Sequence, residues 1–78
     1  SGLEIRRVKK GDGFGFIDKK GKSISKASSE RILKLVIPPA WKNVVVSNDA
    51  KNYIQAIGTD AKGRKQYIYH PLWVKKNQ

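Results

Sequence analysis

The chain has 78 residues, no cysteine and a single histidine, and its 17 Lys and Arg against six Asp and Glu give a formal net charge of +11 at pH 7. This length allows one domain with a modest core, and the absence of cysteine excludes disulfide bonds and thiolate metal ligands. Because the positive charge is large for the length, we expect a polyanionic partner. Nucleic acid is favoured over a membrane surface, since no long basic amphipathic helix is visible.

Both ends of the chain are polar and indicate an excised domain. Ser1 and Gly2 stand where an initiator Met is expected and are interpreted as a cloning remnant, whereas residues 75–78 are expected to begin a linker. The domain itself is expected over residues 3–74. No apolar stretch approaches the roughly 20 residues of a membrane span, and no signal peptide is visible, so we expect an intracellular protein without membrane contact.

The first third of the chain has the pattern of short strands. Over residues 3–24 the apolar residues fall in small groups, among them Phe14, Phe16 and Ile17, and turns rich in Lys and Gly separate these groups. This spacing is typical of two or three strands joined by tight turns.

A helical pattern follows. Residues 28–36 carry apolar side chains close to a helical stripe, so we expect a short helix with Ser28 or Ser29 as the N-cap and Glu30 in the first turn. The proline pair at positions 38–39 would end this helix, because proline lacks the amide hydrogen and moves the preceding residue out of the helical region.

Three further strands are predicted in the second half. Residues 44–46 and 53–57 are rich in β-branched and aromatic side chains, and the turn-prone residues 47–49 separate them. Residues 60–63 form a loop of hairpin length before a last strand over residues 65–70. The expected fold class is therefore α+β, as a small, predominantly antiparallel sheet domain with one or two short helices.

The run of residues 58–70 combines three cations with two alternating tyrosines. Side chains alternate along a strand, so we expect Tyr67 and Tyr69 to point outward while Ile68 enters the core. Cations neutralise phosphates, and amide or phenol groups reach base edges, which makes this run a candidate nucleic-acid-binding edge. Ordinary cross-strand tyrosine pairs and a solvated basic turn are the competing interpretations. The candidate binding residues are Lys62, Arg64, Lys65, Gln66, Tyr67 and Tyr69.

Two other functions stay open at this point. Residues 13–17 resemble the RNP1 segment of cold-shock and RRM domains, in which strand aromatics stack on unpaired bases, so Phe14 and Phe16 could belong to a single-stranded nucleic-acid or RNA-binding module. The competing interpretation places both rings in the core of an N-terminal hairpin. A third function is a protein-interaction domain whose basic surface contacts an acidic partner.

Enzymatic chemistry has little support in this sequence. Six scattered acidic residues, one histidine and no cysteine provide no convincing nucleophile and base, so we expect no catalytic, metal or cofactor site. His70 is interpreted as structural or interfacial, and Trp41 and Trp73 as core residues. A further basic group is expected to be either a second electrostatic patch or a solvated surface, and it consists of Arg6, Arg7, Lys9 and Lys10.

Three sequence motifs resemble the N-terminal domain of type IB DNA topoisomerases of the poxviral and bacterial kind, and they occur in the same order as in that family. They are Ile-Pro-Pro-Ala-Trp at residues 37–41, Tyr-Ile-Gln-Ala at residues 53–56 and the basic, tyrosine-containing run at residues 58–71. The resemblance spans residues 37–73, and the first 36 residues agree only in outline.

The resemblance implies a mostly antiparallel β domain that forms one half of a C-shaped clamp around duplex DNA, with its surface in the major groove. Gln66, Tyr67 and Tyr69 match residues that contact bases in poxviral relatives, while Lys62, Arg64 and Lys65 match the adjoining basic segment. Thr59 and Ile68 stand where bacterial relatives often carry arginine, whereas His70 follows the bacterial form.

The resemblance also implies a division of labour. In this family the tyrosine nucleophile and its helpers belong to a separate C-terminal domain, which this chain lacks, and the reaction needs neither a metal nor a nucleotide cofactor. The expected partners are therefore duplex DNA and the catalytic domain of the same parent chain, with this domain acting as a monomer. The parent would act in the bacterial cytoplasm or nucleoid, or in the virion or infected cell if it is viral.

Overall fold

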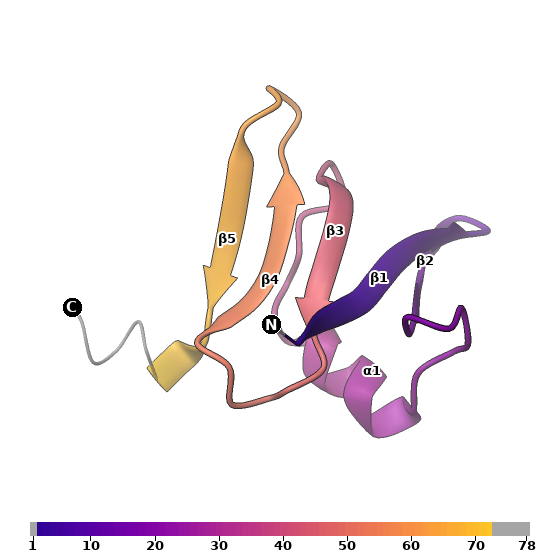
Figure 1. Ribbon diagram of the computed structural model, residues 1–78. Helices are drawn as coiled ribbons and strands as arrows, with labels where there is room; N and C mark the ends of the chain where they lie inside the picture. Colours follow the sequence, from indigo (N-terminus) through magenta and orange to yellow (C-terminus); the bar gives the residue numbers. More distant parts are fainter. Residues whose placement is uncertain (1, 73–78) are drawn as a thin grey trace.

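The computed structural model describes residues 2–72, which form a five-stranded antiparallel sheet with one short helix against it (Figure 1). The order across the sheet is β2-β1-β3-β4-β5, so a hairpin forms each edge. The fold is mostly β and is compatible with the expected α+β class. The elements are β1 (Leu3–Lys10), β2 (Gly13–Ile17), α1 (Lys26–Leu33), β3 (Lys42–Ser47), β4 (Ile54–Thr59) and β5 (Lys65–Tyr69).

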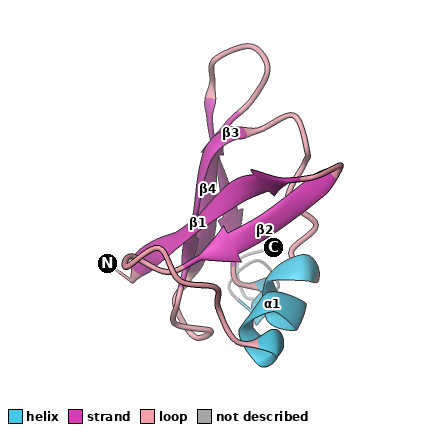
Figure 2. Cartoon of the chain, turned by 90° about the vertical axis from the view of Figure 1, so that its right-hand side faces the viewer, coloured by secondary structure: helices cyan, strands magenta, loops and turns pink. Residues whose placement is uncertain are grey.

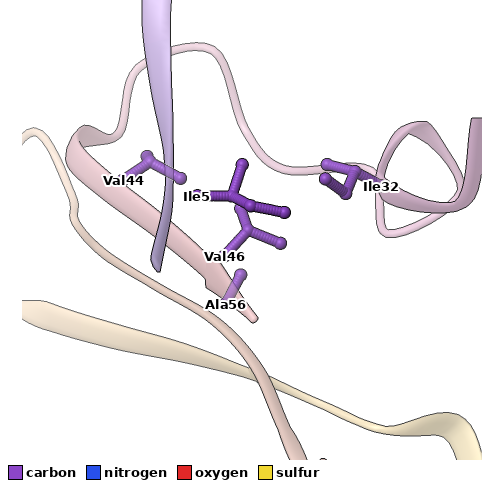
Figure 3. Close-up of a cluster of buried hydrophobic side chains, with 5 residues drawn as sticks. All are labelled: Ile5, Ile32, Val44, Val46 and Ala56. Carbon is purple, nitrogen blue, oxygen red and sulfur yellow. The ribbon is translucent and has the colours of Figure 1, made fainter. Parts of the chain in front are cut away.

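The hydrophobic core lies between α1 and one face of the sheet (Figure 3). Its buried side chains come from the three middle strands and from the helix, and they are Ile5, Val44, Val46, Ala56 and Ile32. Phe16, Trp41 and Ile68 pack around this cluster. Figure 2 shows the helix on one side of the sheet, with β1 and β2 running obliquely to β3 and β4. Within residues 2–72, no second helix of this length covers the opposite face.

Helix α1 begins earlier than the sequence pattern predicted. Its N-cap is Ser25, whose Oγ accepts a hydrogen bond from the backbone N–H of Ser28 at 3.2 Å. Ser28 and Ser29 therefore lie inside the helix, and its first turn contains no acidic residue, so the predicted position of Glu30 was wrong as well. All three serines favour the N-cap position, and local propensity alone does not rank them.

The helix also ends before the prolines that were expected to stop it. Its last residue is Leu33, and Val36 adopts a left-handed backbone with φ of 53°, so the chain has already turned away before it reaches Pro38. Arg7 anchors the segment between α1 and β3, because its Nη1 donates to the carbonyl of Pro38 at 3.1 Å and its Nη2 to that of Trp41 at 2.6 Å. A tertiary contact thus sets the course of this segment.

Arg31 fastens α1 to the sheet. Its Nη1 donates to Gln55 Oε1 and its Nη2 to the Ser47 carbonyl, both at 2.7 Å. The two acceptor residues are almost completely buried, with 2% and 0% exposure. The pairing of β4 with β5 shifts between Ile54 and Ala56, and this irregularity allows Gln55 to face the helix.

We expect Arg31→Met to lower the free energy of unfolding by about 2–4 kcal/mol, because it removes two hydrogen bonds from a charged donor to buried acceptors. Urea denaturation followed by circular dichroism measures this change. Arg6→Met is the matched control, since Arg6 is exposed and should change the stability by less than about 0.5 kcal/mol. Equal midpoints for the two variants would contradict the fastening role of Arg31.

Gly58 is required because Trp41 lies directly against it. A Cβ atom at position 58 would lie 2.6 Å from Trp41 Cε3, which is closer than real Cβ atoms approach other heavy atoms, and 3.2 Å from Val44 Cγ2, which is an unusually tight contact. The indole ring can therefore cover β4 only where that strand has no side chain.

We expect Gly58→Ala to destabilise the domain by about 1–3 kcal/mol through overpacking against the indole. Thermal unfolding monitored by tryptophan fluorescence provides the measurement. Gly13→Ala is the matched control in β2, since a Cβ atom there meets nothing within 4 Å. A Gly58→Ala protein as stable as this control would show that the Trp41 ring moves away without cost.

Candidate nucleic-acid interface

The turn between β4 and β5 is built around Asp60. The Asp60 backbone N–H donates to the Arg64 carbonyl at 2.9 Å, and the Gly63 N–H donates to the Asp60 carbonyl at 3.0 Å. Asp60 Oδ1 also accepts from the backbone N–H groups of Lys62 at 3.0 Å and Arg64 at 2.9 Å. Gly63 has φ of +80°, a left-handed conformation that glycine adopts without steric cost. The predicted hairpin loop is therefore confirmed.

Lys65, Tyr67 and Tyr69 form a column on the face of β5 that points away from the helix. The tyrosines are 41% and 39% exposed, and their ring centroids lie 6.2 Å apart with an interplanar angle of 20°. The Lys65 ammonium lies 5.7 Å from the centroid of the Tyr67 ring. Ile68 points the other way and packs against the core. The predicted outward tyrosines and inward Ile68 are confirmed.

The register of the sheet extends this column across the helix-free face from β5 to β1. Arg6 pairs with Val45, Val45 pairs with Ile57, and Ile57 pairs with Tyr67. Cross-strand partners share a face, so the row joins Arg6 on β1 to Tyr67 on β5 through two half-buried aliphatic side chains. This row is thus a short apolar strip with a cation at one end and a tyrosine at the other.

A second row adds a cation that the sequence pattern did not reveal. Lys42 pairs with Thr59, and Thr59 pairs with Lys65, so the two lysines share the helix-free face. Lys42 and Lys65 are distant in the sequence, and only the pairing of three strands brings them into one row.

Arg64 and Gln66 lie apart from the tyrosines, in a cluster around Asp60. Arg64 Nε and Gln66 Nε2 both donate to Asp60 Oδ2, at 2.9 and 3.0 Å. Gln66 points to the face of β5 opposite Tyr67, but β5 is an edge strand, so both of its faces border the same open edge. Lys62 is exposed in the turn. Five of the six candidates are thus divided between two clusters at one edge, and Lys62 lies in the turn beside them.

Sequence reasoning did not single out Asp60 as a functional residue. The signal that could have found it is an aspartate three residues before a glycine in a hairpin loop, because Asp side chains bond backbone N–H groups two residues ahead in such turns. The bonds to the side chains of Arg64 and Gln66 carry no comparable local signal, since they depend on the direction in which β5 leaves the turn.

The N-terminal aromatic pair lies on the helix side of the sheet. Phe16 packs against the core, as the core interpretation predicted, but Phe14 is 45% exposed and that interpretation is wrong for it. The Arg7 guanidinium lies 4.1 Å from the centroid of the Phe14 ring and covers one of its faces. The two rings line a shallow, mainly apolar pocket of about 190 Å³ beside α1.

The structure also tests the predictions made for Arg7, Trp41 and His70. Arg7 bonds backbone carbonyls inside the fold, so it does not belong to a free N-terminal patch. Trp41 packs against the core as predicted, whereas Trp73 and the expected linker at residues 75–78 lie outside the described residues. His70 has a structural contact, because its Nδ1 accepts from the backbone N–H of Leu72 at 3.0 Å.

The described part of the chain lacks two further features. Residues 2–72 contain no group of three or more His, Cys, Asp or Glu side chains placed to hold a metal ion. None of the helices in this range is long and apolar enough to cross a membrane.

The hydrogen bonds in the β4–β5 turn change the acidity of Asp60. They stabilise the carboxylate, with the backbone N–H of Arg64 contributing most and the Gln66 and Arg64 side chains and the Lys62 backbone adding to it, against an opposing effect of partial burial. The pKa of Asp60 is thereby lowered from 3.8 to about 2.

We expect NMR titration of the Asp60 carboxyl carbon to give a pKa of about 2. Because the folded pKa lies below the unfolded value of 3.8, the stabilisation by Asp60 is complete above that pH and is lost as the pH falls toward 2. The backbone amide signals of Lys62 and Arg64 should shift over the same range. A midpoint near 3.8 would show that the turn does not hold these bonds in solution.

Comparisons with known proteins agree on one family. The model of the family described as bacterial DNA topoisomerase IB, N-terminal domain, matches residues 13–60. DNA topoisomerase 1B of Acanthamoeba polyphaga mimivirus is 47% identical over 72 residues, which cover 91% of this chain and 21% of that protein. This chain therefore spans about a fifth of the length of that relative.

The extent of the family match adds to the sequence-based resemblance. It begins at residue 13, so it includes β2 and α1, which lie where the sequence motifs show a resemblance only in outline. The mimivirus match leaves out less than a tenth of the chain and so includes the β4–β5 hairpin. This chain belongs to the family of bacterial-type DNA topoisomerase IB N-terminal domains.

Proposed function

We propose that this domain binds duplex DNA and that the β5 edge enters the major groove. The observation that carries the proposal is the column of Lys65, Tyr67 and Tyr69, exposed on an edge strand of a chain with net charge +11. The major groove, about 12 Å wide, admits a two-stranded β-ribbon. The β4–β5 hairpin is such a ribbon, with its basic turn at one end.

Within this interface the tyrosines and the lysines have different roles. The tyrosine rings contact base edges and sugars in the groove, where an apolar body with a polar tip suits both partners. Lys62 and Lys65 contact phosphates on either side of the groove. Lys42 extends the phosphate contacts along the helix-free face toward β3.

The proposal extends to the parent protein. The mimivirus relative is named a DNA topoisomerase 1B and is about five times longer than the matched region. We infer that the parent of this domain relaxes supercoiled DNA by cutting and resealing one strand, with its catalytic residues in the remainder of its chain. The isolated domain binds DNA as a monomer but does not relax it, and the complete protein works in the compartment that holds its DNA.

We expect the domain to prefer duplex DNA over single-stranded DNA and RNA, with affinity that falls steeply with salt because phosphate contacts release counterions. The double variant Tyr67→Ala/Tyr69→Ala should weaken duplex binding by about tenfold or more, since each lost base contact costs on the order of 1–3 kcal/mol. Fluorescence anisotropy over a salt series measures both effects.

Phe14→Ala is the matched control for that experiment, because it removes an exposed aromatic ring from the other edge of the sheet. It should leave duplex affinity unchanged. A preference for single strands that depends on Phe14 would instead favour the RNP-like function. Binding to an acidic protein with none to nucleic acid would favour the third function.

A further inference from the structure

Two turns of this domain have the same backbone construction. Residues 18–22 and 60–64 both follow the pattern Asp-x-Lys-Gly followed by Lys or Arg. In the first turn, Asp18 Oδ1 accepts from the backbone N–H groups of Lys20 at 2.8 Å and Lys22 at 3.0 Å. The glycines have φ of +82° and +80°, and each donates its N–H to the aspartate carbonyl at 3.0 Å. One carboxylate oxygen is therefore sufficient to close such a turn.

Asp60 differs from Asp18 in the use of its second oxygen. Asp60 Oδ2 accepts from the side chains of Arg64 and Gln66, whereas no described side chain donates a hydrogen bond to Asp18. The additional bonds do not serve the turn itself. They orient the two polar side chains at the edge where the candidate interface lies.

The chemistry of a carboxylate determines how Gln66 is oriented. An ionised carboxylate has no proton to donate, so the group that faces Asp60 must be the Gln66 amide nitrogen. Rotation of an amide by half a turn exchanges its oxygen and its nitrogen, but the Asp60 carboxylate can accept a hydrogen bond only from the nitrogen. Gln66 Oε1 is left without a donor among the described residues, and it is available to a ligand.

We propose that Asp60 is a positioning residue that sets the hydrogen-bond polarity with which Gln66 reads a base pair. The amide presents its oxygen as an acceptor, which suits a base that offers an exocyclic amino group, adenine N6 or cytosine N4. It disfavours guanine O6 and thymine O4, because both are acceptors. This inference rests on the proposed duplex binding and specifies the class of base read at one position.

Replacement of Asp60 by asparagine should invert this polarity. Asp60→Asn keeps one oxygen for the backbone N–H groups of the turn but places an amino group where Oδ2 accepted. That amino group would oppose the donors of both Gln66 and Arg64. Rotation of the Gln66 amide by half a turn relieves the first conflict, and the exposed Arg64 side chain can turn into solvent to relieve the second. Gln66 then presents its nitrogen to DNA and favours guanine or thymine.

A second change should restore the original polarity. In Asp60→Asn/Gln66→Glu, one carboxylate oxygen of residue 66 accepts from the new asparagine and the other faces DNA as an acceptor. The net charge equals that of the unaltered domain, so a change in overall electrostatics does not account for the restoration. Asp18→Asn is the matched control, since it removes the same charge from the equivalent turn, which holds no side chain.

The experiment is selection of bound duplexes from a randomised library, followed by sequencing, for the unaltered domain and these variants. We expect one position to favour adenine or cytosine, and Asp60→Asn to change the ratio of these bases to guanine and thymine at that position by about tenfold. The double variant should restore the original preference, and Asp18→Asn should leave it unchanged. Gln66→Leu should abolish the preference with the turn intact, so the proposal remains falsifiable if Asp60→Asn does not fold.

The outcomes separate this inference from the proposed function. Failure of the unaltered domain to bind duplex DNA overturns both. Duplex binding with no base preference, or with a preference that Asp60→Asn or Gln66→Leu leaves in place, overturns the role of Asp60 alone. A loss of affinity that is equal for all sequences in Asp60→Asn also overturns it, because a purely structural residue would act in that way.

Discussion

A single helix of eight residues can cover only one face of a five-stranded sheet, and the rest of this structure depends on that limit. Ile32 contributes the buried contact and Arg31 the polar anchor through which α1 is held. The side chains that alternate onto the helix side form the core, while those on the other side stay accessible within the described chain. The division between the core face and the accessible face therefore follows from strand alternation.

The open edge at β5 exposes the domain to unwanted strand pairing, and it also leaves β5 accessible to a ligand. An exposed edge strand with unpaired backbone groups invites pairing with another chain, and proteins commonly prevent this with charged side chains. Lys65 on the strand and Lys62 in the turn provide such charges. The same cations suit a polyanionic groove, so the protection of the edge and the proposed recognition of DNA use the same residues.

Asp60 combines backbone construction with side-chain orientation. Its first oxygen closes the turn as Asp18 does elsewhere, and its second oxygen is free for Arg64 and Gln66 because β5 leaves the turn with those side chains beside it. A carboxylate that accepts four hydrogen bonds remains ionised, which keeps the orientation of both neighbours independent of pH in the neutral range. The side chains of Arg64 and Gln66 at the candidate interface are thus oriented by one residue.

The sequence by itself determined the strand-rich class, the three C-terminal strands and the outward direction of Tyr67 and Tyr69, because a period of two and turn chemistry are local properties. It also carried the family resemblance in residues 37–73. Only the tertiary structure decided that Lys42 shares a row with Lys65, that Arg7 binds backbone carbonyls, and that Asp60 holds Gln66. The N-cap at Ser25 was missed because three nearby serines have equivalent local preferences. The other relations depend on strand register and on contacts between distant segments, and local propensity has no information about either.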